Sequence, residues 1–317
     1  MMTTEERLTE IFFPHATPRI EKARENQNID FVHYTSAEAA KAILENGEWW
    51  MRHSSTMNDF QEIRHGLKCL NRGRNAHLES LNKLLNQASS GLAERLERDL
   101  PRWVRMFSSD TFLTSFSEHY RNKEDEFGRL SMWRAYGGMA SVAVILNKQT
   151  FLGASDLLKI YGSPVGYLNE GDFVEEFERL LNSLSKNIDF LRQQPQGELY
   201  RFMFNVYRFA ILCTKHPGFS EEKEWRIVHS PSNDLGSPLK TKIVSLDGVP
   251  QPIRVVPLNG ELIERAAMGI SNVVDRIIIG PTQYPDAMWT AFVTILKRAG
   301  IPDPEDKVSV SNIPLRT

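Results

Sequence analysis

Three residues that can contact a nucleotide stand at the end of a short apolar segment. His33, Tyr34 and Thr35 close a strand expected over residues 30–35. An imidazole can exchange a hydrogen bond with a ribose hydroxyl, and a tyrosine ring can stack on a flat heterocycle. The same residues could also form a structural His-Tyr pair at a sheet edge. Both interpretations stay open from the sequence.

A second segment places two hydroxyls on one face of an expected strand. Residues 115–118 read Ser-Phe-Ser-Glu within a strand expected over residues 111–118. Because side chains alternate along a strand, Ser115 and Ser117 share one face and Phe116 lies on the other. Two hydroxyls opposite an apolar anchor can line a polar cleft. The alternative is an ordinary half-solvated strand.

A third segment carries aromatic residues on a short expected helix, residues 129–137. Aromatic side chains on helices mostly pack in the core, and this is the simpler expectation for Trp133. Tyr136 precedes Gly137 and Gly138, where the helix should end, so it is better placed to project into a cleft. Trp133 and Tyr136 are the candidates here for contact with a heterocycle.

A fourth segment, residues 221–228, gathers three carboxylates where a loop becomes a strand. Alternation puts Glu224 and Arg226 on one face and Trp225 on the other. A carboxylate at the lip of a sheet can hold a ribose hydroxyl and stabilise an oxocarbenium-like centre, whose positive charge it opposes. Alternatively, the acids form a solvated cluster, or Glu224 pairs with Arg226 or with a lysine across strands.

Composition narrows the function classes. The formal net charge of −2 gives no bulk attraction to nucleic acid or to anionic membranes. The two cysteines, Cys69 and Cys213, form no metal-ligand spacing and no disulfide framework, which favours a reducing compartment. No signal peptide and no membrane span are expected, so the sequence predicts a cytoplasmic protein. The GxxxxGK[ST], HExxH, CxxC and GxSxG motifs are absent, and no metal site is expected.

The elements that must position these residues follow an α+β pattern. Strands and helices alternate without a regular βαβ rhythm. Residues 1–28 are expected to form an N-terminal helical arm, broken at Pro14 and Pro18, and residues 29–317 the main domain. Apolar residues at helical spacing predict helical insertions at about residues 61–106 and 170–213.

In this order, the segments resemble a bacterial family known as a domain of unknown function. The segments that carry the resemblance read FVHYT, MNDF, SFSE, MWRAYGG and KHPGFSEEKEWRIV. The resemblance spans roughly residues 30 to 316, and the EKEWR segment is its most specific part. Phe60 departs from the pattern, because the family often has proline after the Asn-Asp turn.

At a deeper level the pattern resembles the ADP-ribosyltransferase superfamily. The resemblance implies a split mixed sheet with helical insertions, in which three strands meet at one NAD cleft. The first ends in His or Arg, the second carries Ser-x-Ser or Tyr, and the third begins with a catalytic Glu. It implies NAD contacts for His33, Tyr34 and Thr35, with Ser115 and Ser117 in the Ser-x-Ser place.

The resemblance also assigns the chemistry. Glu224 would bind the 2′-hydroxyl of the nicotinamide ribose, with Glu222 two residues before it as in ExE transferases. Tyr136 would stack on nicotinamide, with Trp133 beside it. The combination of His33 with Ser-x-Ser matches neither major subclass, which would also fit a degenerate, non-catalytic site.

The predicted function is therefore transfer of ADP-ribose from NAD to a macromolecule, with a toxin or anti-phage role and a neutralising antitoxin as expectations by analogy. One alternative is a nucleic-acid-binding or nucleic-acid-processing protein that uses the cleft without NAD. Its basic and aromatic candidates are Arg121, Lys123, Arg129, Trp133 and Arg134. Another is a non-enzymatic interaction module whose working surface is the helical insertions. The sequence leaves the acceptor and the oligomeric state open.

Overall fold

The structure is a computed structural model, and it describes residues 2–56, 60–136, 140–153, 155–246, 248–260, 263 and 268–314. By internal packing the chain divides into two compact units. The helical unit comprises residues 1–22, 54–111 and 163–220, and the strand unit comprises residues 23–53, 112–162 and 221–317. The arm and domain limits expected from the sequence stay a prediction.

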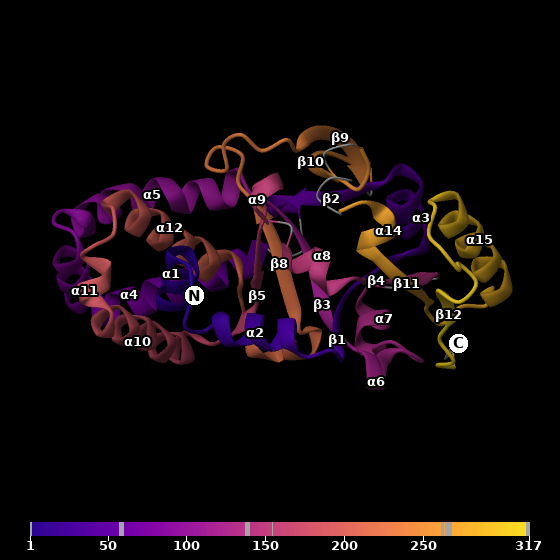
Figure 1. Cartoon of the computed structure of the whole chain (residues 1–317), viewed down its shortest axis with the longest axis horizontal. Helices are drawn as coiled ribbons and strands as arrows, with labels where there is room; N and C mark the ends of the chain where they lie inside the picture. The colour runs from indigo at the N-terminus through magenta and orange to yellow at the C-terminus, as the bar shows by residue number, and fades with distance from the viewer. Residues whose placement is uncertain are drawn as a thin grey trace. The chain divides into compact units, whose positions relative to one another are not determined.

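The helical unit is built from long amphipathic helices (Figure 1). These are α1 (Thr4–Phe12), α4 (Phe60–Ala88), α5 (Leu92–Ser109), α10 (Glu170–Lys186) and α12 (Gln196–Leu212), and the single-turn α11 (Ile188–Leu191) follows α10. In α5 the buried residues Leu92, Leu96, Leu100, Trp103 and Phe107 recur every three or four positions, which makes one apolar stripe. The helices predicted over the two insertions are thus present.

Short elements complete the helical unit. They are the 3-10 helix η1 (Ser54–Thr56) and the parallel pair β6 (Gly166–Tyr167) and β7 (Thr214–Lys215). The unit boundaries fall within α2 (Thr17–Glu25), β5 (Tyr161–Pro164) and the 3-10 helix η2 (Pro217–Glu222). Thr3 caps α1 through a capping box with Glu6, as its position before an acidic first turn requires.

The strand unit holds most of the strands and several short helices. Its strands are β1 (Ile29–Ser36), β2 (Glu48–His53), β3 (Phe112–Tyr120), β4 (Ser141–Leu146), β8 (Glu224–His229), β9 (Lys240–Leu246), β10 (Val249–Pro257), β11 (Val274–Ile279) and β12 (Val308–Val310). Its helices are α3 (Ala37–Asn46), α6 (Arg121–Glu124), α7 (Leu130–Tyr136), α8 (Lys148–Gly153), α9 (Ser155–Leu158), α14 (Ile270–Val273) and α15 (Pro285–Arg298).

The strands form one mixed sheet in the order β12-β11-β4-β1-β3-β2-β10-β9, and β8 pairs with β3 as well. The β11–β12 pair is parallel, whereas β1 is antiparallel to both β3 and β4. A mixed sheet with many helices confirms the α+β class. Ser36 caps α3 and Gly47 ends it in a left-handed conformation with φ 61°, as Ser36 and the Asn46-Gly47 pair predict.

Strand β3 has β8 along one edge, whereas two strands, β1 and β2, share its other edge. On one edge β8 follows β3 from Phe112 to Ser117. The other edge is therefore shared: β1 pairs with Ser117–Tyr120, and β2 pairs with Phe112 and Leu113. Residues 114–116 lie in the gap between β1 and β2, and the candidate site is built around this gap.

No helix in the described ranges contains an apolar stretch long enough to cross a bilayer.

Candidate functional site

Three of the segments singled out from the sequence lie on neighbouring strands. β3 pairs with β1 and with β8, so the HYT, Ser-x-Ser and EWRIV segments are adjacent although they are remote along the chain. Ser117 is opposite Val32 on β1 and opposite Glu224 on β8. Directly opposite residues share a face of the sheet. The face that contains Ser115, Ser117, Glu224 and Arg226 is called the serine face below.

On the serine face, a serine and an arginine hold the Glu224 carboxylate. The Ser115 hydroxyl donates to Glu224 Oε1 at 2.5 Å. Arg226 Nε donates to the same oxygen at 2.8 Å, and its Nη2 donates to Oε2 at 3.2 Å. Glu224 is 5% exposed and Arg226 is 1% exposed. The fork geometry of guanidinium suits a carboxylate, and burial makes this contact stronger than it would be in water.

This pairing corrects the expectation of an open carboxylate at the lip of the sheet. The sequence left several arrangements open, and the structure has the one in which Glu224 pairs with Arg226. Glu224 must turn away from Arg226 before it can bind a ribose hydroxyl. Separating a buried ion pair is costly, because a lone buried charge loses both its hydration and its partner.

On the opposite face, His33 packs in an aromatic cluster. Its ring lies 5.0 Å from the Trp49 ring and 5.6 Å from the Phe116 ring, between centroids. Trp225 belongs to the same face and meets Phe31 edge to face at 4.9 Å. Burial lowers the pKa of His33, although its hydrogen bond to the Ser115 carbonyl acts in the opposite sense. This face, with its five rings, is called the aromatic face below.

Ser115 connects the two faces across the gap in the sheet. His33 Nδ1 lies 2.9 Å from the Ser115 carbonyl oxygen. A neutral imidazole protonated at Nδ1 donates to that carbonyl, which lies at the gap between β1 and β2. The side chain of Ser115 reaches Glu224 on the other face. His33 and Glu224 therefore do not face each other, and one serine joins them.

Tyr34 and Trp133 form part of the core on the serine face of β1. The two rings meet edge to face at 4.7 Å, and the side chains are 6% and 5% exposed. The Tyr34 hydroxyl accepts the backbone N–H of Arg129 at 2.9 Å, and Trp133 Nε1 donates to the Phe127 carbonyl at 2.8 Å. The core expectation for Trp133 is confirmed. Tyr34 is sequestered rather than turned to a cleft, because its ring and hydroxyl both serve internal packing.

The remaining predicted contacts lie further out. Ser117 is buried on the serine face, and Thr35 is half-buried on β1 beyond the last pair with β3. Tyr136 ends α7 and is 46% exposed. Gly137 and Gly138, expected to end that helix, lie outside the described residues, as does the turn at residues 57–59.

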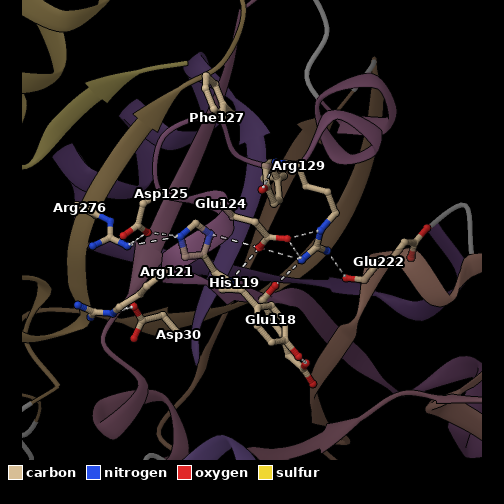
Figure 2. Close-up of polar contacts among 12 residues, drawn as sticks. Asp30, Glu118, His119, Arg121, Glu124, Asp125, Phe127, Arg129, Glu222 and Arg276 are labelled. Atoms are coloured by element: carbon tan, nitrogen blue, oxygen red, sulfur yellow. Dashed lines mark hydrogen bonds and ion pairs between the residues drawn. The ribbon is translucent and has the colours of Figure 1, made fainter. Parts of the chain in front are cut away.

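Arg129 fixes the segment that leads into β8. Its Nη1 donates to the backbone carbonyls of Glu221 and Glu222 at 2.9 and 3.1 Å, and its Nη2 donates to the Glu118 carbonyl at 2.6 Å. Arg129 Nε also donates to Glu124 at 2.9 Å. Figure 2 shows this guanidinium between Glu124 and Glu222. Glu222, predicted as a second catalytic acid, here contributes a backbone carbonyl to the anchoring of the loop.

A neighbouring polar cluster lies at the same end of the sheet (Figure 2). His119 Nε2 lies 2.7 Å from Asp125 Oδ1, and Arg276 contacts the same carboxylate. Arg121 Nε donates to Asp30 at 2.5 Å. Burial lowers the pKa of His119, against the opposing effect of Asp125. These contacts join β1, β3, α6 and β11, so the cluster stabilises the end of the sheet.

Two side chains of the site were not proposed from the sequence. Trp49 follows α3 on β2, and its Nε1 donates to the Thr114 hydroxyl at 3.2 Å beside the gap. Glu118 is 9% exposed and accepts hydrogen bonds from Trp225 Nε1 and the Tyr120 hydroxyl at 3.0 and 2.9 Å. The sequence could have indicated Glu118, because this residue ends the Ser-Phe-Ser-Glu segment. The position of Trp49 could not be predicted in this way, because it depends on the order of the strands in the sheet.

No group of three or more His, Cys, Asp or Glu side chains is arranged to hold a metal ion in the part of the chain that the structure describes.

Comparison with known proteins gives one match. A family model described as a protein of unknown function (DUF2971) matches residues 132–227. The match begins at the MWRAYG segment and includes most of EWRIV, while HYT and Ser-Phe-Ser-Glu lie outside it. No curated protein and no solved structure matches the chain. The chain thus contains a segment similar to this family, consistent with the predicted resemblance to a domain of unknown function.

Proposed function

We propose that this protein transfers ADP-ribose from NAD to a macromolecular acceptor. One observation carries the proposal: the Ser115 hydroxyl contacts the Glu224 carboxylate at 2.5 Å on adjacent strands, with the His33 strand next to them. The predicted ADP-ribosyltransferase resemblance requires these three strands at one site. The toxin or defence role and the antitoxin stay expectations by analogy.

In the proposed reaction, the bond between the nicotinamide nitrogen and ribose C1′ breaks. Nicotinamide leaves with the bonding electron pair, which neutralises its ring nitrogen. Positive charge then develops at C1′ and the ring oxygen, where the Glu224 carboxylate would oppose it. An acceptor oxygen or nitrogen forms the new bond to C1′ and releases its proton to solvent. The chemistry needs restraint of NAD and one free carboxylate.

The carboxylate must first be released from Arg226. The positively charged nicotinamide ring and the ribose hydroxyl would replace Arg226 as partners of the Glu224 carboxylate. Arg226 in turn could pair with a phosphate of NAD, because guanidinium binds phosphate in the same forked way. The proposal therefore includes a partner exchange at Arg226.

A second candidate is a catalytically silent interaction module. The buried Glu224–Arg226 pair favours it, because a carboxylate held by a permanent cation has a structural role already. In this case the helical unit would provide the working surface. Variants of Glu224 that fold would then keep the full cellular effect.

The nucleic-acid alternative has less support. Of its candidates, Arg121 pairs with Asp30, Arg129 holds the loop before β8, and Trp133 is buried. Lys123 and Arg134 are exposed. Two exposed cations make a small phosphate-binding surface compared with the several contacts that support non-specific binding.

The test is label transfer. Purified protein is incubated with NAD labelled in the adenylate part and with a cell lysate, and the products are digested separately with nuclease and with protease. We expect labelled macromolecule with the wild type and a loss of at least a hundredfold with Glu224→Gln. Glu175→Gln, the same change at an exposed position of α10 in the helical unit, is the matched control. Equal labelling by wild type and Glu224→Gln would overturn the catalytic assignment.

A further inference from the structure

The helical unit contains a cavity that the proposed function does not use. Its volume is about 110 Å³. An apolar cavity of roughly 150 Å³ can stay dry and bind benzene, so this one has room for about one small ring. The apolar part of its wall is made by side chains from three segments of the unit, namely α10, α12 and the residue that follows α1. They are Phe13, Phe173, Phe177, Leu180, Val206 and Phe209.

The rim of the cavity carries one polar corner. His15, in the turn between α1 and α2, lines the cavity together with Glu176 of α10. His15 Nδ1 lies 3.1 Å from Glu176 Oε2, and Glu176 Oε1 pairs with Arg179 at 2.8 Å. The His15 side chain is 38% exposed, which places the ring at the solvent side.

Two atoms of this corner are buried without a hydrogen bond. Within the described part of the chain, neither His15 Nε2 nor Glu176 Oε2 has a hydrogen-bond partner. Gly166 lies against the same ring, since a Cβ there would be 3.2 Å from His15 Nε2. In the tautomer with its proton on Nδ1, the imidazole offers Nε2 as an acceptor, and a carboxylate oxygen only accepts. The corner therefore lacks a donor.

We infer that this cavity binds a small aromatic molecule that carries a hydroxyl or amine donor on its ring. The ring fills the apolar wall, and the donor satisfies His15 Nε2 at the rim. Buried polar atoms without partners are costly, so a ligand that supplies the donor gains affinity over an apolar molecule of equal size. The site is separate from the strand unit and does not depend on NAD chemistry.

The experiment compares phenol with toluene, two rings of similar size that differ in the donor. Both are titrated into the full-length protein, with binding measured by calorimetry and by the rise in melting temperature. We expect phenol to bind about fivefold more tightly than toluene, the effect of one hydrogen bond. In His15→Phe the two compounds should bind alike, because the acceptor is lost.

Two further variants test the position of the site. Ala210→Leu adds a branched side chain to the cavity wall and should abolish binding of both compounds, provided that circular dichroism shows a folded protein. Ala76→Leu makes the same change at an exposed position of α4 and should bind like the wild type. The inference is overturned if the wild type binds neither compound, binds both equally, or if Ala210→Leu binds phenol unchanged.

Discussion

The buried carboxylates on the two faces of the sheet at β1, β3 and β8 have different partners. On the serine face, Glu224 is paired with a cation, Arg226, and with the Ser115 hydroxyl. On the aromatic face, Glu118 accepts hydrogen bonds from two neutral donors, Trp225 Nε1 and the Tyr120 hydroxyl, and interacts electrostatically with Lys223. The guanidinium of Arg226 matches a carboxylate or a phosphate in the same forked way, whereas indole and phenol donors make weaker hydrogen bonds to an anion. This difference makes the serine face the better candidate for binding a charged substrate.

Breaking the ion pair should have the largest effect on stability. Arg226→Met keeps most of the side-chain volume but leaves the Glu224 carboxylate buried without its cation. We expect a loss of about 3–5 kcal/mol in the free energy of unfolding, measured by urea denaturation. A double variant, Glu224→Leu with Arg226→Met, should recover most of this loss, because no charge remains buried. A single variant as stable as the wild type would mean that the pair contributes nothing.

Removing the Ser115 hydroxyl should lower the free energy of unfolding by less than breaking the ion pair does. Ser115→Ala deletes a hydrogen bond to a charged group, which is worth about 1.5–3 kcal/mol. Ser117→Ala is the matched control, because Ser117 lies on the same face and its hydroxyl makes no hydrogen bond among the described residues. The measurement is the urea midpoint of both variants. Equal losses would show that the contact between Ser115 and Glu224 has no special weight.

The aromatic face should make stability depend on pH. Burial holds the pKa of His33 below its ordinary value of 6.5 in the folded protein. The unfolded chain therefore binds the proton first, so the contribution of His33 is complete above about pH 6.5 and is lost as the pH falls toward its folded pKa. The slope contributed by one histidine is at most about 1.4 kcal/mol per pH unit.

His33→Gln is the variant that isolates this effect, because its amide can still donate to the Ser115 carbonyl but does not titrate. Its free energy of unfolding, followed from pH 7.5 to 5, should fall less steeply than that of the wild type. His119 also has a lowered pKa and remains in both proteins, so it cancels in the comparison. Parallel curves would contradict the assignment to His33.

Alternation along the strands could be predicted from the sequence, and it gave the correct faces. Ser115 is on the face of Glu224, and Phe116 is on the opposite one. The gap at β3 could not be predicted, because it depends on where β1 stops pairing and β2 begins. The register of β1 on β3 could not be predicted either. It puts Val32 opposite Ser117, so His33 and Glu224, which the sequence brought into one cleft, lie on opposite faces.

The burial of the site could not be predicted from the sequence either. The Glu224–Arg226 pair is visible as two residues at positions i and i+2 of a strand, but its exposure depends on what packs over that face. Arg129 shows the same limit: its three backbone carbonyl partners come from β3 and from the loop before β8, and a backbone carbonyl leaves no signal in residue types.

The most direct test of the central claim is release of nicotinamide from NAD by the purified protein without any acceptor. Glu224 acts on bond cleavage itself, so this assay depends on the serine face and not on the target. The account predicts measurable release by the wild type, at least a hundredfold less with Glu224→Gln, and a near wild-type rate with Glu175→Gln, the same change at an exposed position of α10. Equal rates for the wild type and Glu224→Gln, or no release by the folded wild type, would contradict it.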